Sequence, residues 1–289
     1  MTGLRDWVAG ARPRTLPAAV APVLVGTGAA AGAGAFDAGR ALLALLVSLA
    51  LQIGVNYAND YSDGVRGTDA DRIGPTRLVA AGLATASAVR TAALVCFAVG
   101  AVAGLVLAAM TTWWLIAVGA VAIGAAWFYT GGAKPYGYRA LGEVSVFLFF
   151  GVVAVVGTSY VQAEQILSQA VVASIPVGLL ACALLVVNNL RDIEGDAVSG
   201  KRTLAVLLGA RRTRWLYAAM IVLSFAVVAG LAAALRPFAA LALAAAILAL
   251  PPVGAVLGGA RGLALLPALR DTGSMQLLLG VLLAIGLAI

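Results

Sequence analysis

The sequence predicts an all-α integral membrane protein, a single domain over residues 1–289 with about nine transmembrane helices. Of its 289 residues, 63% are hydrophobic and only 11% are charged, which is far from the composition of a soluble domain. Apolar runs of roughly 18 to 24 residues recur along the whole chain, long enough to cross a bilayer core as helices. They leave no room for a separate soluble domain, and no nucleic-acid partner is expected.

The expected helices follow the apolar runs in chain order. These runs lie near residues 16–33, 40–59, 88–109, 112–130, 141–160, 167–189, 214–235, 238–258 and 272–289. The segment before the first run carries Arg5, Arg12 and Arg14, and no small-residue cleavage site follows that run. We therefore expect a retained first helix rather than a cleaved signal peptide.

The loop charges predict the orientation of the chain. Basic residues are kept in cytoplasmic loops, and with the N-terminus inside, only Arg40 and Arg236 of the 19 basic residues fall outside. Of the 12 acidic residues, only Asp37 and Glu164 fall outside. Both signs of charge therefore gather on the cytoplasmic side, where we expect the chemistry of a multi-pass protein of the plasma (inner) membrane.

Histidine is absent, which removes the commonest general base near neutral pH and the commonest transition-metal ligand. The two cysteines, Cys96 and Cys182, lie inside expected spans and are interpreted as small core residues rather than a disulfide or a metal pair. Any metal in this protein should be a hard cation that prefers oxygen ligands.

Two of the expected helices end in similar polar sequences, NYANDYSD (56–63) and NNLRDIEGD (188–196). Spacings of i, i+4, i+7 in the first and i, i+4, i+8 in the second keep the polar residues on one face of a helix. Each helix end thus presents one amide and two carboxylates: Asn56, Asp60 and Asp63, then Asn188, Asp192 and Asp196.

Each of these ends is followed by a polar, basic, glycine-containing segment, GVRGTDADRIGPTR after the first and AVSGKRTLAVLLGARR after the second. The two segments are interpreted as cytoplasmic caps. Their correspondence suggests two related halves, about 1–140 and 141–289. A third cytoplasmic loop, YTGGAKPYGYR (129–139), adds aromatic and basic residues.

Four carboxylates that converge without a counterion would repel one another, and a hard divalent cation resolves the conflict. Mg²⁺ takes oxygen ligands and commonly bridges one or two carboxylates to substrate phosphates. The pattern indicates Mg²⁺-dependent ionisation of a diphosphate, with an apolar bundle to shelter a lipid tail. Basic residues of the same loops are candidates to neutralise the remaining phosphate charge: Arg66, Arg72, Arg77, Lys134, Arg191, Lys201 and Arg202.

Other interpretations account for less of the pattern. A single aspartate pair after a membrane helix is usually a solvated helix end, but two such ends in corresponding places favour function. A cation-coupled transporter would carry its acids near the bilayer centre on broken helices, whereas here they cluster at helix ends. A purely structural membrane protein gives no reason for the pairs. The cluster Arg211, Arg212 and Arg214 is interpreted as a topology and headgroup anchor.

At these residues the sequence resembles the UbiA superfamily of intramembrane aromatic prenyltransferases, and within it the MenA-type branch, whose acceptor is 1,4-dihydroxy-2-naphthoate. The resemblance covers nearly the whole chain. Its marks are ARPRTLPAAVAPVLVGTG (11–28), NYANDYSDGVRGTDADRIGPTRL (56–78), YTGGAKPYGYRALGE (129–143) and NNLRDIEGDAVSGKRTLAVLLG (188–209). It implies nine transmembrane helices around a central cavity that is capped on the cytoplasmic side.

The resemblance also implies roles for particular residues. Asp60, Asp63, Asp192 and Asp196 would hold Mg²⁺, while Asp69 is a weaker candidate because the third aspartate position of many relatives is Gly67 here. Lys134 is expected at the diphosphate and counted with those four aspartates as catalytic. The expected substrate-binding residues are Asn56, Asn59, Arg66, Arg72, Arg77, Tyr129, Tyr138, Arg139, Asn188, Arg191, Lys201 and Arg202.

The implied reaction joins a polyprenyl diphosphate to 1,4-dihydroxy-2-naphthoate, with loss of pyrophosphate and CO₂, to give demethylmenaquinone. Arg139, with its planar fork, is assigned to the acceptor's carboxylate. Tyr129, Tyr136 and Tyr138 could shield an allylic cation with their ring faces, or could simply form an interfacial aromatic belt. The alternative acceptors within this class are 4-hydroxybenzoate, homogentisate and a chlorin.

Overall fold

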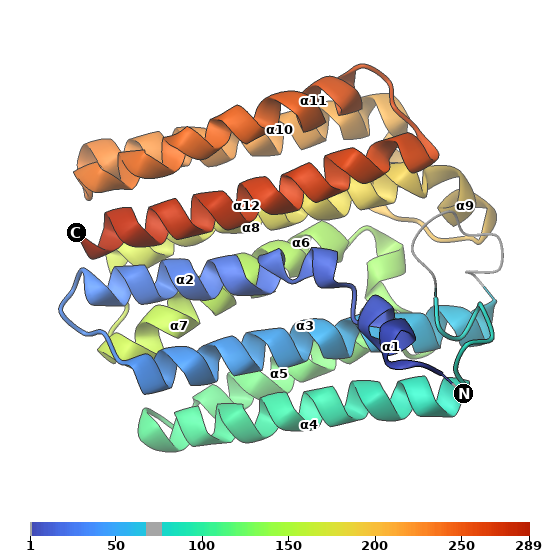
Figure 1. Ribbon diagram of the computed structural model, residues 1–289, viewed down its shortest axis with the longest axis horizontal. Coiled ribbons are helices and arrows are strands. Elements are labelled where there is room, and N and C mark those ends of the chain that lie inside the picture. The colour runs from blue at the N-terminus through green and yellow to red at the C-terminus, as the bar shows by residue number, and fades with distance from the viewer. Residues whose placement is uncertain (1, 68–76) are drawn as a thin grey trace.

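The computed structural model describes residues 2–67 and 77–289, and these residues form a helical bundle (Figure 1). The first half contains α1 (Leu4–Gly10), η1 (Pro13–Thr15), α2 (Pro17–Ala31), α3 (Ala38–Arg66), α4 (Ala86–Met110), α5 (Leu115–Phe128) and η2 (Tyr136–Arg139). The second half contains α6 (Gly142–Val146), the π-helix η3 (Phe147–Val153), α7 (Ala154–Ala163), α8 (Ser168–Arg191), α9 (Ile193–Val198), α10 (Leu204–Ala234), η4 (Pro237–Ala249), α11 (Leu250–Leu257), η5 (Gly262–Leu265) and α12 (Leu266–Ala288). The predicted all-α class is confirmed.

Within the described ranges, seven helical segments are long and apolar enough to cross a bilayer. They are α3, α4, α6 through α7, α8, α10, η4 through α11, and η5 through α12. Two shorter apolar helices, α2 and α5, coincide with the remaining two predicted runs. The protein is therefore a multi-pass membrane protein, and its helical segments follow the apolar runs of the sequence.

One helix begins well before the run that predicts it. The α10 helix starts at Leu204 rather than near residue 214, because Thr203 caps it by accepting a hydrogen bond from the Val206 amide at 3.4 Å. The chain then breaks at Gly209 (φ 75°, ψ 161°), a conformation that glycine adopts more readily than other residues. The amino-terminal turns of α10 thus form a separate short segment next to α9.

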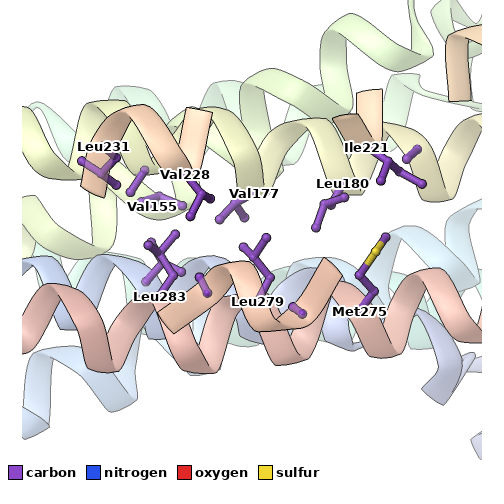
Figure 2. Close-up of a cluster of buried hydrophobic side chains, with 14 of the residues drawn as sticks. Val155, Val177, Leu180, Ile221, Val228, Leu231, Met275, Leu279 and Leu283 are labelled. Carbon is purple, nitrogen blue, oxygen red and sulfur yellow. The ribbon is translucent and has the colours of Figure 1, made fainter. Parts of the chain in front are cut away.

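The central helix of the bundle is α8, which packs against α10, α12 and α2. Figure 2 shows Val177 and Leu180 of α8 facing Leu279 of α12 and Val228 of α10. Because aliphatic side chains attract one another no more strongly than they attract lipid tails, close packing rather than water exclusion holds these helices together.

Small residues let other helix pairs approach closely. A Cβ added to Gly28 of α2 would lie 2.3 Å from the carbonyl oxygen of Ala284 on α12, and one added to Gly280 would lie 2.7 Å from Ala21. These are distances at which a side chain cannot fit without moving a backbone. The α2–α12 contact therefore depends on glycines, which is the small-residue packing expected within membranes.

The chain direction brings both polar helix ends together. Figure 1 shows α1 and α9 at one end of the bundle, and the carboxyl terminus at the other. The last turns of α3 lie at the same end of the bundle as α9, and α8 leads directly into α9. The two aspartate-containing sequences therefore occupy the same end of the bundle. The division into two related halves stays a prediction.

We expect Gly28→Val to lower the apparent melting temperature of the detergent-solubilised protein. The added side chain would overlap the α12 backbone, and overpacking of this kind costs about 1 to 3 kcal/mol. Gly230→Val on α10 is the matched control, because a Cβ at Gly230 meets nothing within 4 Å. Equal melting temperatures for the two variants would contradict the close α2–α12 contact.

Candidate active site

A cavity of about 860 Å³ lies inside the bundle, between α2, α3, α4, α5, α7 and α8. Along α3 its wall runs from Ala44 to Asp63, about 28 Å of helix at the usual rise per residue. Charged and amide side chains line the end near α9. Aliphatic and aromatic side chains line the rest, including Leu107, Leu115 and Phe149. The cavity is shaped for a molecule with a polar head and a long apolar body.

Asp63 is the centre of the polar end. Its buried carboxylate accepts a hydrogen bond from the Tyr138 hydroxyl and lies 3.4 Å from Lys201 Nζ and 3.7 Å from an Arg77 guanidinium nitrogen. The Lys201 ammonium also lies 4.8 Å from the centre of the Tyr138 ring. Asp63 thus draws together the end of α3, the segment at residue 77, η2 and the loop after α9.

Lys201 connects the two aspartate sequences, because its Nζ also lies 4.0 Å from Asp196. Its backbone amide donates to the Asp196 carbonyl at 2.8 Å, which fixes the start of the loop. On the same side, Arg191 holds Asp192 through two hydrogen bonds of 2.7 and 2.6 Å. All these side chains line the cavity, so three of the four carboxylates predicted to converge, Asp63, Asp192 and Asp196, line one cavity in the structure.

Asp60 lies behind the cavity wall rather than among the residues that line it. Its side chain is fully buried, and its two oxygens accept from the backbone amides of Leu78 and Val79 at 2.8 and 3.0 Å. These bonds hold the segment that carries Arg77 against α3. The structure therefore gives Asp60 a positioning contact, and its role as a metal ligand stays a prediction.

The amino-terminal segment closes over the polar end through contacts that were not predicted. Asn56 Nδ2 donates to the Ala11 carbonyl at 2.9 Å and to Thr15 Oγ1 at 3.0 Å. The Arg12 guanidinium donates in return to the Asn56 carbonyl at 3.3 Å, and Gln52 donates to Thr15 at 2.9 Å. Arg12 sits in the left-handed region (φ 53°), a strained conformation for a residue with a side chain. Arg12, Thr15 and Gln52 all line the cavity.

A signal for this contact exists in the sequence. The ARPRT stretch places two arginines and one proline before the first span, but arginines next to a span are ordinarily topology signals. Only the fold shows that η1 turns Arg12 inward.

The loop 129–139 departs from its predicted role. Lys134 and Arg139 are exposed and do not line the cavity, because η2 turns Tyr136 and Tyr138 inward instead. The Tyr136 hydroxyl donates to the Ala125 carbonyl at 2.8 Å and pairs with Ser145 Oγ at 2.9 Å. Burial raises the pKa of Tyr136, and the Ser145 contact offsets part of that rise, so Tyr136 is a neutral donor.

The remaining predicted site residues divide between wall and exterior. Asn59, Tyr129 and Asn188 line the cavity, and Asn59 accepts a hydrogen bond from Thr130 at 2.7 Å. Arg66 and Arg202 are exposed. Arg66 nevertheless donates to the carbonyls of Thr130 and Gly132, and the Arg202 backbone amide donates to the Tyr138 carbonyl at 2.9 Å. Asp69 and Arg72 lie outside the described residues.

Arg40, at the start of α3, lies near the opposite end of the cavity. Its guanidinium binds Glu164 at 2.6 Å, the Val161 carbonyl at 2.9 Å and the Met110 carbonyl at 2.8 Å. These contacts join the ends of α3, α4 and α7 just beyond the cavity residues Val161 and Leu107. The cavity thus has one charged end and one apolar end, and Arg40 ties three helices together beyond the apolar end.

The donor set fits a hard cation that shares its ligands with a substrate. Among the described residues, no group of three or more carboxylate, thiol or imidazole side chains is close enough to form a self-contained metal site. Asp63, Asp192 and Asp196 line one cavity and each already faces a basic residue. Mg²⁺ commonly uses one or two carboxylates and completes its shell with phosphate oxygens and water, which matches this arrangement.

A membrane-embedded helical bundle that joins aspartates and cations at one end of an apolar cavity is built to bind an amphiphile with an anionic head. The chain belongs to the UbiA prenyltransferase family, whose model matches residues 19–259. It is therefore a prenyltransferase, as the resemblance predicts.

Three relatives that share one printed name are similar to this chain over most of its length. The chain is 53% identical to "1,4-dihydroxy-2-naphthoate octaprenyltransferase" of Mycobacterium tuberculosis, over 100% of this chain and 98% of the relative. It is 41% identical to the Escherichia coli protein of the same name, over 74% and 72% of the two chains. It is also 32% identical to that of Bacillus subtilis, over 96% and 90%.

Solved structures show the same fold at low identity. The apo structure of a UbiA homologue from Aeropyrum pernix K1 matches with a TM-score of 0.70 and 17% identity, over 92% of this chain and 96% of that one. A UbiA homologue from Archaeoglobus fulgidus, bound to DMAPP and Mg²⁺, matches with a TM-score of 0.68 and 14% identity, over 96% and 99%. The predicted family and membrane fold are confirmed.

We expect Lys201→Ala to lower kcat/KM for the prenyl diphosphate by about ten- to a hundredfold, the effect of losing one charge-assisted contact. Lys134→Ala should change it by less than about twofold, since a charge outside the cavity is largely screened. Steady-state prenyl transfer with the diphosphate varied would measure both. A larger loss for Lys134→Ala than for Lys201→Ala would restore the predicted role of Lys134.

Proposed function

We propose that this protein transfers a polyprenyl group from polyprenyl diphosphate to 1,4-dihydroxy-2-naphthoate, with loss of pyrophosphate and CO₂, to give the quinol form of demethylmenaquinone. The observation that carries the proposal is 53% identity over the full chain to a relative named for this reaction. The cavity supports it independently, because its charged end suits a diphosphate and its apolar length suits a polyprenyl tail.

The diphosphate would bind among Lys201, Arg77 and Arg12 at the polar end, with its tail along α3, α4 and α5. Arg77 is buried beside Asp63, with 3.7 Å between the two charged groups, and it lines the cavity. A guanidinium at this place suits an anionic oxygen of a ligand. Each ion pair at Asp63 would then be shared with the substrate.

Mg²⁺ is the proposed cofactor, and Asp63, Asp192 and Asp196 are the cavity carboxylates available to hold it, one or two for each ion. Two structures of the Archaeoglobus fulgidus homologue are described as bound to Mg²⁺, one with DMAPP and one with GPP, which supports this choice. When bound, the ion supplies positive charge to the oxygens of the diphosphate leaving group. The carboxylates of the chain hold that charge at the mouth of the apolar cavity.

The chemistry balances without a general base. The allylic C–O bond breaks, and its electron pair leaves with the diphosphate. A π pair of the acceptor ring then forms the new C–C bond at the carbon that bears the carboxylate. That carboxylate leaves as CO₂, and its bonding pair restores the aromatic ring. No ring proton has to be removed, which agrees with a chain that has no histidine.

The residues of the chain have the remaining tasks of shelter and orientation. Tyr129 and Tyr138 present aromatic rings to the cavity where the allylic cation would form. The apolar wall keeps water from the cation, which would otherwise be captured as an alcohol. Phe149 and Phe150 of η3 extend this wall, and the π-helix gives that turn a wider spacing.

Purified protein in detergent with Mg²⁺ and geranylgeranyl diphosphate should prenylate 1,4-dihydroxy-2-naphthoate and release CO₂, with the product identified by its mass. Chelation by EDTA should abolish turnover, and added Mg²⁺ should restore it. 4-Hydroxybenzoate and homogentisate are the comparison acceptors. Faster turnover of either would replace the naphthoate in this proposal, and full turnover after metal stripping would remove Mg²⁺ from it.

We further propose that the protein lies in the plasma membrane with its N-terminus and polar end in the cytoplasm. Lys134→Cys at the polar end and Phe36→Cys at the opposite end provide a matched pair, since both positions are exposed. In a Cys96→Ala, Cys182→Ala background, a membrane-impermeant maleimide added to intact cells should label Phe36→Cys only. Labelling of Lys134→Cys alone would show that the protein has the opposite orientation.

A further inference from the structure

A buried carboxylate lies beside the cavity and has no part in the diphosphate chemistry. Glu143, in the first turn of α6, is 7% exposed and does not line the cavity. Its Oε1 accepts a hydrogen bond from Asn189 Nδ2 of α8 at 3.2 Å. Its Oε2 has no hydrogen-bond partner among the described residues. Burying an acid in this way is costly, so a function for the contact is expected.

The contact fixes the orientation of Asn189, which does line the cavity. In the structure the Asn189 NH₂ group donates to Glu143, so the amide oxygen points away from that side chain. Within the described part of the chain, no hydrogen bond uses that oxygen. The oxygen is also not one of the fully buried side-chain atoms that lack a partner, so a ligand can reach it. Asn189 therefore offers one oriented acceptor at the cavity wall.

The cavity wall near Asn189 includes two tyrosine rings. Tyr129 and Tyr136 meet edge to face, with ring centres 5.5 Å apart and an angle of 89° between the rings. The Tyr129 hydroxyl lies against the start of α6, 3.0 Å from where a Cβ on Gly142 would be. An amide oxygen backed by a carboxylate repels an anion and attracts a hydroxyl. This wall therefore suits a flat, hydroxylated ring better than it suits a diphosphate.

We infer that Asn189 Oδ1 accepts a hydrogen bond from the 4-hydroxyl of the naphthoate, and that Glu143 acts as a positioning residue for Asn189. The inference rests on the proposed function. The 1-hydroxyl is adjacent to the carboxylate and is occupied by an internal hydrogen bond, which leaves the 4-hydroxyl as the free donor. The contact would orient the ring so that its carboxylate-bearing carbon faces the allylic cation.

The test compares two ring ligands that differ only in the 4-hydroxyl. KM is measured for 1,4-dihydroxy-2-naphthoate, and the inhibition constant is measured for 1-hydroxy-2-naphthoate. Asn189→Ala should raise KM for the dihydroxy compound by roughly three- to tenfold, the worth of one neutral hydrogen bond. The inhibition constant of the monohydroxy compound and the KM of the prenyl diphosphate should not change.

An exchange of the pair separates positioning from folding. Asn189→Asp should lose the preference for the 4-hydroxyl, which is measured by comparing KM of the dihydroxy compound with the inhibition constant of the monohydroxy compound. The reason is that this variant places two carboxylates against each other. The double variant Glu143→Gln, Asn189→Asp should regain it, because the new amide donates to the new carboxylate and an acceptor again faces the cavity. A merely structural role would restore the melting temperature in the double variant without restoring the preference.

Each outcome decides the inference. An unchanged ratio of KM to inhibition constant in Asn189→Ala overturns it, as does a rise confined to the prenyl diphosphate. If Asn189→Ala does not fold, equal ratios in the wild type and Asn189→Asp overturn it instead. A wild-type protein that prenylates no naphthoate overturns the proposed function together with this contact, whereas naphthoate turnover with an unchanged ratio overturns the contact alone.

Discussion

The polar end of this protein depends on the burial of one carboxylate, Asp63. A charge at that depth must be matched, and the chain matches it with Lys201, Arg77 and the Tyr138 hydroxyl, which come from three separate loops. The same Lys201 faces Asp196, so the ends of α3 and α9 share one cation. Loops that would otherwise be independent are therefore held in register by electrostatics. An anionic ligand at this place would enter a site whose cations are already oriented.

The α8 helix carries both the packing and the chemistry. One side holds Val177 and Leu180 in the apolar core (Figure 2), and its last turns present Asn188, Asn189 and Arg191 to the cavity. Because the core fixes the helix, its polar end cannot drift with the loops. The amino-terminal segment is attached differently, through the Asn56 amide and a strained Arg12. Rigid support on one side and a hydrogen-bonded segment on the other suit a cavity that must both hold and exchange ligands.

The helical segments and three aspartates of the site could be predicted from sequence because their signals are local. Apolar runs give the spans, and i, i+4 spacing gives the shared face of each helix end. The positions of Lys134, Arg139 and Arg12 could not be predicted in the same way. The direction in which a short loop turns its side chains depends on tertiary contacts such as that between Tyr136 and Ser145. Asp60 makes contacts that its spacing could not predict, because its oxygens accept from the backbone amides of Leu78 and Val79, which are brought to it by the fold.

The ion pair between Arg40 and Glu164 has a consequence for the cell as a whole. A cavity that follows α3 for most of a bilayer, with charged groups at one mouth, would be a path for protons and ions if its far end were open. Arg40 fastens the ends of three helices across that far end. The Arg40 charge is itself balanced, because Asp37 lies 3.6 Å and Glu164 lies 2.6 Å from its guanidinium. Because those helix ends are tied together, the far end resists the opening that would let ions follow the cavity across the membrane.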